Sequence, residues 1–149
     1  MIYKKGDMLC GDWDVAYHCA NVYKTFGSGV AYYIAKKWPE VYQADIDGDN
    51  ELGFFTKGII KEDGRTIYNL YGQKGVGNDG HPLNRNCSYD HLYDAIYRAC
   101  EDATRLADNV RVGIPQLGCG LAGGSWTVVE AIIKDVEEKT SVEFTVYVL

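Results

Sequence analysis

The chain has 149 residues, a length that leaves room for one hydrophobic core but not for two separate catalytic domains. Its 46% hydrophobic and 24% charged residues exclude a disordered or collagen-like chain. Fifteen basic residues against 21 acidic residues give a formal net charge of −6, so no overall positive field attracts nucleic acid or anionic lipid. We therefore expect one domain over residues 1–149, with neither a membrane nor a sequence-specific nucleic acid as its partner.

The compartment is predicted from apolar runs and cysteines. No apolar run approaches the roughly 18 residues that span a bilayer, and the first residues do not resemble a secretion signal. The five cysteines are odd in number and never spaced as C-x-x-C, which argues against a disulfide framework and against a zinc site. The sequence predicts a cytoplasmic protein with reduced thiols and with no metal or other cofactor.

Residues 2–4 and 14–20 are the first two predicted strands, and the second of them is mostly apolar. After a loop over 21–26, apolar residues recur at the spacing of one helix face from residue 27 until Pro39 helps to end the helix. Residues 45–49 resemble the start of a calcium-binding loop, but Asn50 and Thr56 stand where that pattern needs glycine and glutamate. We predict a surface loop there.

Residues 54–61 and 66–71 are predicted to form a β-hairpin around a turn at 62–65. A polar loop over 75–86 leads to a second amphipathic helix, whose apolar residues are Leu92, Ile96, Ala99, Ala103 and Leu106.

The last part of the chain has the order of a βαβ unit. A strand at 110–114, a glycine-rich loop at 115–125, a helical stripe over 128–136 and a strand at 142–149 follow one another. Strands and helices alternate along the whole chain. This pattern predicts the α/β class, as a three-layer α/β/α sandwich with a mixed, largely parallel sheet.

Two glycine-rich loops stand at predicted strand-to-helix junctions. Gly118 to Gly123 fits G-x-G-x-x-G, and Gly27-Ser28-Gly29 repeats the arrangement before the first helix. Backbone N–H groups at such junctions bind phosphate, and both loops would follow strands of one sheet. We predict a pyrophosphate clamp between them; the alternative is a pair of independent tight turns. A nicotinamide-dinucleotide site is disfavoured, because no acidic residue ends the next strand.

At these residues the sequence resembles the macro domain family, whose members bind ADP-ribose. The matching stretches are His18 to Asn21, Gly27 to Ala31, and Ile114 to Leu121 followed by Trp126, and the likeness extends over nearly the whole chain. The sequence is most similar to a branch with a terminal ADP-ribose protein glycohydrolase and a fungal ADP-ribose 1″-phosphate phosphatase. The resemblance implies the α/β/α fold, and ADP-ribose, ADP-ribose 1″-phosphate or an ADP-ribosylated protein as the partner.

The resemblance also implies roles for individual side chains. Asp7 would accept a hydrogen bond from the adenine amino group, although a turn aspartate is an equally natural interpretation. Asn21 would contact the distal ribose unless it only closes an Asx-turn, and Tyr147 would stack on adenine unless it belongs to the core. The implied substrate-binding residues are Gly6, Asp7, Met8, Cys19, Ala20, Asn21, Phe26, Gly27, Ser28, Gly29, Val30, Ala31, Leu117, Gly118, Cys119, Gly120, Leu121, Ala122, Gly123 and Tyr147.

Two residues are candidates for catalysis. His18 matches a histidine of the phosphatase branch, where imidazole would attack phosphorus or activate water. Lys74, or Gln73 in another alignment, stands where the glycohydrolase branch has a lysine nucleophile, but Ala122 replaces that branch's aspartate. We therefore expect hydrolysis of ADP-ribose 1″-phosphate by His18. Removal of ADP-ribose from protein carboxylates and binding without chemistry are the two alternatives.

Overall fold

The computed structural model describes residues 1–75, 86–120 and 122–149. Within these residues, one sheet contains six strands in the order β1-β6-β5-β2-β4-β3. The strands are β1 (Ile2–Lys5), β2 (Val15–Cys19), β3 (Phe55–Ile59), β4 (Thr66–Leu70), β5 (Arg111–Ile114) and β6 (Glu143–Val148). The helices are η1 (Met8–Cys10), α1 (Gly29–Lys37), α2 (Pro39–Asp47), α3 (Tyr89–Ala103) and α4 (Trp126–Lys139).

The sheet is mixed and largely parallel, as predicted. Four neighbouring pairs of strands are parallel, and the hairpin of β3 and β4 is antiparallel. The predicted βαβ unit is β5-α4-β6, and its two strands are parallel neighbours. Because β2 and β5 run in the same direction side by side, the loops that follow them leave the sheet at the same edge.

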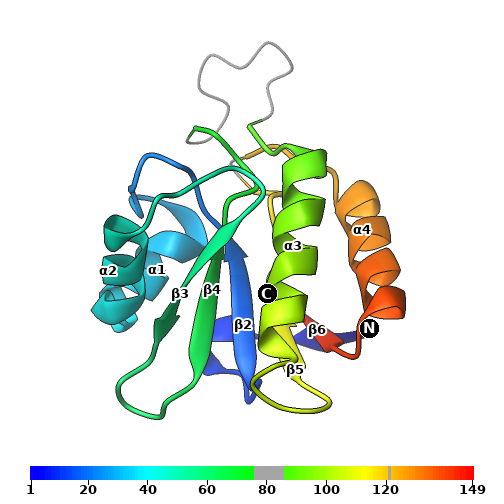
Figure 1. Cartoon of the computed structure of the whole chain (residues 1–149). Coiled ribbons are helices and arrows are strands. Elements are labelled where there is room, and N and C mark those ends of the chain that lie inside the picture. Colours follow the sequence, from blue (N-terminus) through cyan, green and yellow to red (C-terminus); the bar gives the residue numbers. More distant parts are fainter. Residues whose placement is uncertain (76–85, 121) are drawn as a thin grey trace.

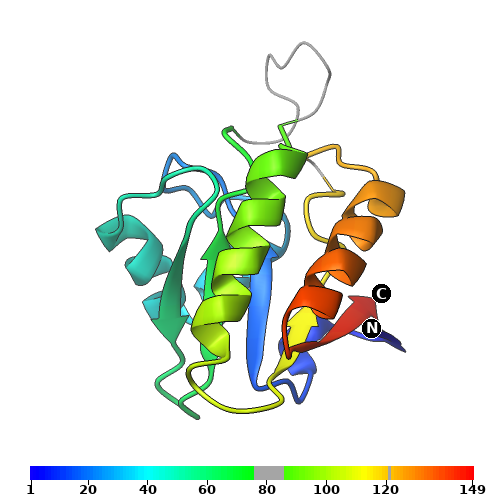
Figure 2. The ribbon, with the colours of Figure 1, turned by 45° about the vertical axis from the view of Figure 1, so that its right-hand side comes forward.

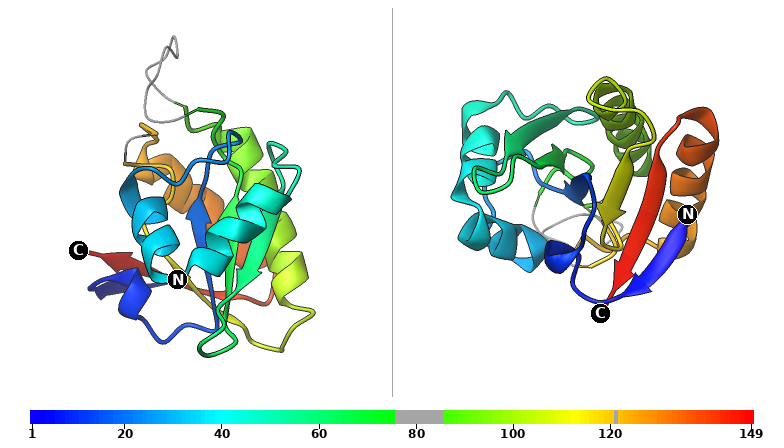
Figure 3. Two further views of the ribbon diagram at one scale, coloured as in Figure 1. Left: turned by 90° about the vertical axis from the view of Figure 1, so that its left-hand side faces the viewer. Right: turned by 90° about the horizontal axis from the view of Figure 1, so that it is seen from below.

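The helices form two layers, one on each face of the sheet. α3 and α4 cover the face turned toward the viewer in Figure 2, whereas α1 and α2 lie on the opposite face, as Figure 3 shows from the side and from below. Successive residues of β2 alternate between two buried clusters: Val15 and Tyr17 pack under α3 and α4, and Ala16 packs on the other side. The predicted three-layer α/β/α sandwich is therefore confirmed.

One α-helix, α2, was missing from the sequence-based prediction, as was the short 3-10 helix η1. Pro39 follows the end of α1 and also occupies the first turn of α2, where its missing N–H costs nothing. Asp45 therefore lies in a helix and is fully buried, so the predicted surface loop at 45–49 is wrong for this residue. Its Oδ1 accepts hydrogen bonds from the Tyr71 hydroxyl at 2.5 Å and from the Asn50 amide at 3.1 Å.

Most of the predicted polar loop at 75–86 lies outside the described residues, as does Leu121. No helix in the described part of the chain is long and apolar enough to cross a membrane. Figure 1 shows the loops that follow β2 and β5 at the upper end of the molecule, between the two helix layers.

Candidate functional site

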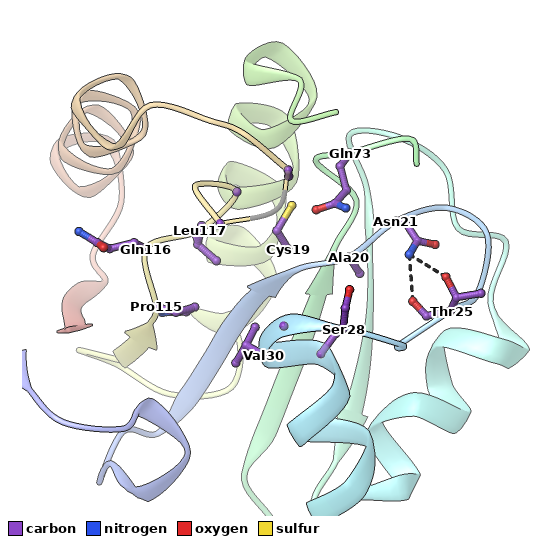
Figure 4. A pocket seen from close by; sticks show the side chains of 15 residues that line it. Cys19, Ala20, Asn21, Thr25, Ser28, Val30, Gln73, Pro115, Gln116 and Leu117 are labelled. Carbon is purple, nitrogen blue, oxygen red and sulfur yellow. Dashed lines mark hydrogen bonds between the residues drawn. The ribbon is translucent and has the colours of Figure 1, made fainter. Parts of the chain in front are cut away.

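Two adjoining cavities form one cleft at the edge of the sheet where β2 and β5 end. The inner cavity has a volume of about 210 Å³ and the outer cavity about 660 Å³. Both are lined by Gly29, Val30, Pro115 and Gln116, which form the waist of the cleft. Figure 4 shows the inner cavity, with the end of β2 between the start of α1 and Leu117. The cleft therefore runs between the two glycine-rich loops that the sequence singled out.

The first glycine loop, residues 26–29, is fixed to α2 by side chains. Phe26 is buried and stacks on Tyr42, with ring centroids 4.7 Å apart. The Lys24 ammonium donates to the carbonyl oxygens of Ile46 and Gly48 at 2.7 and 2.8 Å, at the negative C-terminal end of α2. Gly27 and Gly29 have no heavy atom within 4 Å of where a Cβ would lie. This loop is therefore anchored to α2, while the space beside Gly27 and Gly29 stays open.

Asn21 begins this segment and performs the local role that the sequence left open. Its Oδ1 accepts from the Tyr23 amide at 2.8 Å, the contact of an Asx-turn, and its Nδ2 donates to the Thr25 carbonyl and hydroxyl oxygens at 2.9 Å (Figure 4). Asn21 also lines the inner cavity. The turn is confirmed, and a contact with ribose stays a prediction.

The second glycine loop, residues 117–124, is fixed by main-chain hydrogen bonds and by close packing. The Gly124 amide donates to the Gly118 carbonyl at 2.7 Å, and the Cys87 amide donates to the Ala122 carbonyl at 3.1 Å. Gly118 has φ +67°, and a Cβ there would lie 2.8 Å from the Cys87 sulfur. Gly120, in contrast, lines the inner cavity and has open space around it.

The thiols near the inner cavity are unreactive in their environment. Cys19 lines the cavity, and burial raises the pKa of its thiol well above the ordinary range. Burial also raises the pKa of Cys119 to about 11, and its sulfur donates to the Leu117 carbonyl at 3.2 Å. A thiolate nucleophile needs a lowered pKa, so neither residue is suited to that role.

The outer cavity lies beside η1 and the end of β6. Asp7 is the N-cap of η1, and its Oδ1 accepts from the Leu9 amide at 2.9 Å. Tyr147 lines the cavity but is only 8% exposed, and its phenol packs where a Gly11 side chain would otherwise lie. Tyr33, which no sequence motif singled out, lines the same cavity and is 59% exposed.

His18 lies in the core behind the cleft and lines neither cavity. It is fully buried, and its Nε2 lies 2.6 Å from the Asn69 Oδ1, while its Nδ1 has no hydrogen-bond partner. Its ring meets Phe26 edge-on at 5.2 Å, directly behind the first glycine loop. Burial lowers the pKa of His18 to about 4, so the imidazole is neutral near pH 7. The ring is therefore not at the surface of either cavity, and a catalytic role for His18 stays a prediction.

A row of buried polar side chains extends from His18 to α2. Asn69 is the register partner of both His18 and Thr56 on the neighbouring strands, and its Nδ2 donates to the Thr56 hydroxyl at 3.1 Å. The Thr56 and Tyr71 hydroxyls lie 2.6 Å apart, and Tyr71 donates to Asp45. This row of hydrogen bonds gives each of its side chains at least one polar partner, and it connects the first glycine loop to the end of α2.

The structure also separates Lys74 from the cleft. Lys74 is exposed, and Gln73 lines the inner cavity in its place, with its Nε2 donating to the Gly75 carbonyl at 2.8 Å. Ala122 lines the same cavity. Among the described residues, the inner wall therefore carries no carboxylate, ammonium or imidazole group, and no cluster of His, Cys, Asp or Glu is arranged to hold a metal.

Most of the predicted binding residues meet at the cleft. The predicted residues that line it are Gly6, Asp7, Met8, Cys19, Ala20, Asn21, Ser28, Gly29, Val30, Ala31, Leu117, Gly118, Gly120, Ala122 and Tyr147. Phe26, Gly27, Cys119 and Gly123 belong to the two loops but line neither cavity, and Leu121 lies outside the described residues. The lining residues that the prediction left out are Leu9, Thr25, Tyr33, Gln73, Pro115, Gln116, Val148 and Leu149, each next to or near a predicted stretch.

The chain is similar to known proteins over nearly its whole length. No family model matches the chain. The bovine ADP-ribose glycohydrolase OARD1 is 30% identical over 151 residues, which cover 99% of this chain and 90% of that protein. The macrodomain of Thermus aquaticus DarG has a TM-score of 0.81 at 21% identity and covers 99% of this chain and 97% of its own.

A third relative has a nucleotide in its structure. Thermosipho africanus DarTG in complex with ADP-ribose has a TM-score of 0.76 at 15% identity, and the match covers 98% of this chain and 41% of that one. The two solved structures share the fold, and the bovine relative matches in sequence over nearly the full length of both chains. The chain therefore belongs to the macro domain family.

Proposed function

We propose that the cleft binds ADP-ribose, with the base in the outer cavity, the diphosphate at the waist and the distal ribose in the inner cavity. The observation that carries this assignment is that the two cavities share Gly29, Val30, Pro115 and Gln116, so they form one cleft between the two glycine loops. Backbone N–H groups at the start of α1 supply positive potential there, which an acidic protein needs in order to hold a diphosphate.

The groups at the two ends of the cleft suit a nucleoside diphosphate sugar. Asp7 in the outer cavity is a hydrogen-bond acceptor for an exocyclic amine. Asn21 and Gln73 in the inner cavity carry neutral amides, which pair with sugar hydroxyls as donors and acceptors. The relatives support the same ligand, since one is named an ADP-ribose glycohydrolase and another was solved with ADP-ribose bound.

A hydrolytic reaction at the distal ribose is the second candidate function, and the name of the bovine relative favours it. We propose the hydrolysis of ADP-ribose 1″-phosphate to ADP-ribose and phosphate in preference to release from protein carboxylates. The reason is that release from protein carboxylates would need an amine to attack an opened ribose, and Lys74 lies outside the described cavity, whereas hydrolysis of the phosphate ester needs only a water molecule as nucleophile. In this proposal the cleft positions the phosphate ester for hydrolysis, and His18 supports the first glycine loop without touching the substrate.

Two measurements test these proposals. Calorimetry with ADP-ribose should show binding, and a chain that binds nothing at millimolar ligand contradicts the whole assignment. Phosphate release from ADP-ribose 1″-phosphate should be seen with the parent and should fall at least about tenfold for Asn21→Ala, because the ribose contact is lost. A parent that binds ADP-ribose but releases no phosphate, and no ADP-ribose from a glutamyl-modified protein, acts by binding alone.

A further inference from the structure

The outer cavity has two aromatic side chains on its described wall, and they differ in what they offer a ligand. Tyr147 is 8% exposed and has its phenol packed over Gly11, so little of its ring faces the cavity. Tyr33 is 59% exposed and comes from α1. A planar base needs an accessible ring in order to stack, and Tyr33 is far more exposed than Tyr147.

We propose that Tyr33 is the stacking surface for the nucleobase, and that it is a specificity-determining residue of this cleft. The inference rests on the proposed function, because it assumes that the outer cavity receives the base of a nucleotide. Asp7 lines the same cavity and provides the acceptor that a purine amino group requires. Tyr33 therefore supplies affinity through its ring, and Asp7 supplies selection among bases.

The position of Tyr33 on α1 couples base binding to the waist of the cleft. Gly29 and Val30 lie four and three residues before Tyr33, and residues at these spacings share one face of a helix. One helix face therefore carries both the waist and the ring, so a diphosphate at the helix start leaves its nucleoside directed toward Tyr33. Ile34 is fully buried and fixes α1 against the sheet.

The ring of Tyr33 is also supported from its side. Tyr32 meets it edge-on, with centroids 5.2 Å apart, and the Lys36 ammonium lies 5.9 Å above the Tyr32 ring. An exposed aromatic with such a neighbour loses less conformational entropy when a ligand stacks on it than a freely rotating side chain does. The Tyr33 ring is therefore partly preorganised for stacking on a planar base.

Calorimetry with ADP-ribose on four proteins tests the proposal. Tyr33→Ala should bind about 10- to 100-fold more weakly than the parent, which is the range expected for loss of one aromatic–base stack. Tyr33→Phe keeps the ring and should bind within about twofold of the parent. Tyr23→Ala is the matched control, since Tyr23 is 58% exposed but lines neither cavity, and it should bind like the parent.

Ribose 5-phosphate, which has no base, separates stacking from a general effect on the cleft. An NMR titration should give the same affinity for the parent and for Tyr33→Ala. Equal ADP-ribose affinity of parent and Tyr33→Ala overturns the stacking role while the proposed function stands. Weaker binding of ribose 5-phosphate by Tyr33→Ala also overturns it, because the residue then acts on the cleft as a whole. A parent that binds no ADP-ribose contradicts the proposed function itself.

Discussion

Gly29 and Gly118 belong to the two glycine loops, yet they are glycines for different reasons. Both have a left-handed backbone, with φ +63° and +67°, and both line the cleft. A Cβ at Gly29 would meet no heavy atom within 4 Å, whereas one at Gly118 would lie 2.8 Å from the Cys87 sulfur. The first glycine leaves space open in the cleft, and the second lets two protein segments pack. A shared motif therefore combines a requirement for binding with a requirement for folding.

The two loops also differ in how they are anchored. The first is held by side chains, among them the Phe26 ring that rests on His18 and Tyr42. The second is held by main-chain bonds and by the packing of Gly118 on Cys87. We therefore expect the first loop to respond to the protonation of buried groups, and the second to respond to the volume of side chains.

The largest effect is expected from Gly118→Ala, which adds a strained φ and a collision with the Cys87 sulfur. The free energy of unfolding should fall by about 3 to 4 kcal/mol in urea denaturation. Gly29→Ala has the same strain without the collision and should lose about 1 kcal/mol. Adding Cys87→Ala to Gly118→Ala should recover part of the loss. Equal losses for the two single variants would mean that backbone strain alone explains both glycines.

The next largest effect is a pH dependence of the free energy of unfolding, which arises from His18 beneath the first glycine loop. The unfolded chain protonates His18 near its ordinary pKa of 6.5, whereas the folded protein does so only near 4. Between these values the unfolded state binds more protons, so acid lowers stability, by on the order of 3 kcal/mol over the window. Asp45 opposes this slope at the acid end, because burial raises its pKa.

Urea denaturation at several pH values between 4 and 7.5 measures this slope. His18→Gln removes the titrating group and retains an amide that can pair with Asn69, so its stability should vary less with pH than that of the parent. Parallel curves for the two proteins would show that His18 does not titrate as its burial implies.

A smaller effect is expected where a glycine faces only the cavity. Gly120→Ala meets no atom within 4 Å and has no positive φ, so its stability should stay within about 0.5 kcal/mol of the parent. The added methyl group occupies space that the ligand needs, and calorimetry should show ADP-ribose binding weakened about tenfold. Unchanged affinity would place the ligand away from this part of the second loop.

The smallest effects are expected at the two helix starts beside the loops. Ser28 and Ser125 are the N-caps of α1 and α4, but neither side chain makes a capping hydrogen bond. Ser28→Ala and Ser125→Ala should therefore each change the free energy of unfolding by less than about 0.5 kcal/mol, below the usual cost of losing a cap. A loss of 1 kcal/mol or more in either variant would reveal a cap that forms in solution.

The fold was predictable because its signals are local and repeated. A mostly apolar run located β2, two strand-like segments around a turn located the hairpin, and helical spacing located α1, α3 and α4. α2 was missed because its buried residues are only Val41 and Asp45, and the burial of Asp45 depends on Tyr71, which is distant in sequence. A proline that ends one helix and starts another gives the same local signal as one that only ends it.

The cleft was also predictable, because glycine and asparagine motifs follow the strands that end there. The placement of His18 and Lys74 outside the cavity was not predictable, since a motif gives the position of a residue but not the direction of its side chain. Neighbouring residues of a strand point to opposite faces, so Cys19 reaches the cavity while His18 enters the core between the sheet and Phe26. Gln73 and Lys74 are likewise neighbours, of which Gln73 alone lines the cavity.

The waist of the cleft has a consequence for how its specificity can change. Gly29, Val30, Pro115 and Gln116 are shared by both cavities, but Tyr33 lines only the outer one and Asn21 only the inner one. Residues without shared partners contribute additively to binding. If ADP-ribose binds as proposed, a double-mutant cycle between Tyr33 and Asn21 should therefore give a coupling energy near zero, and a change at the ribose end should leave base recognition intact.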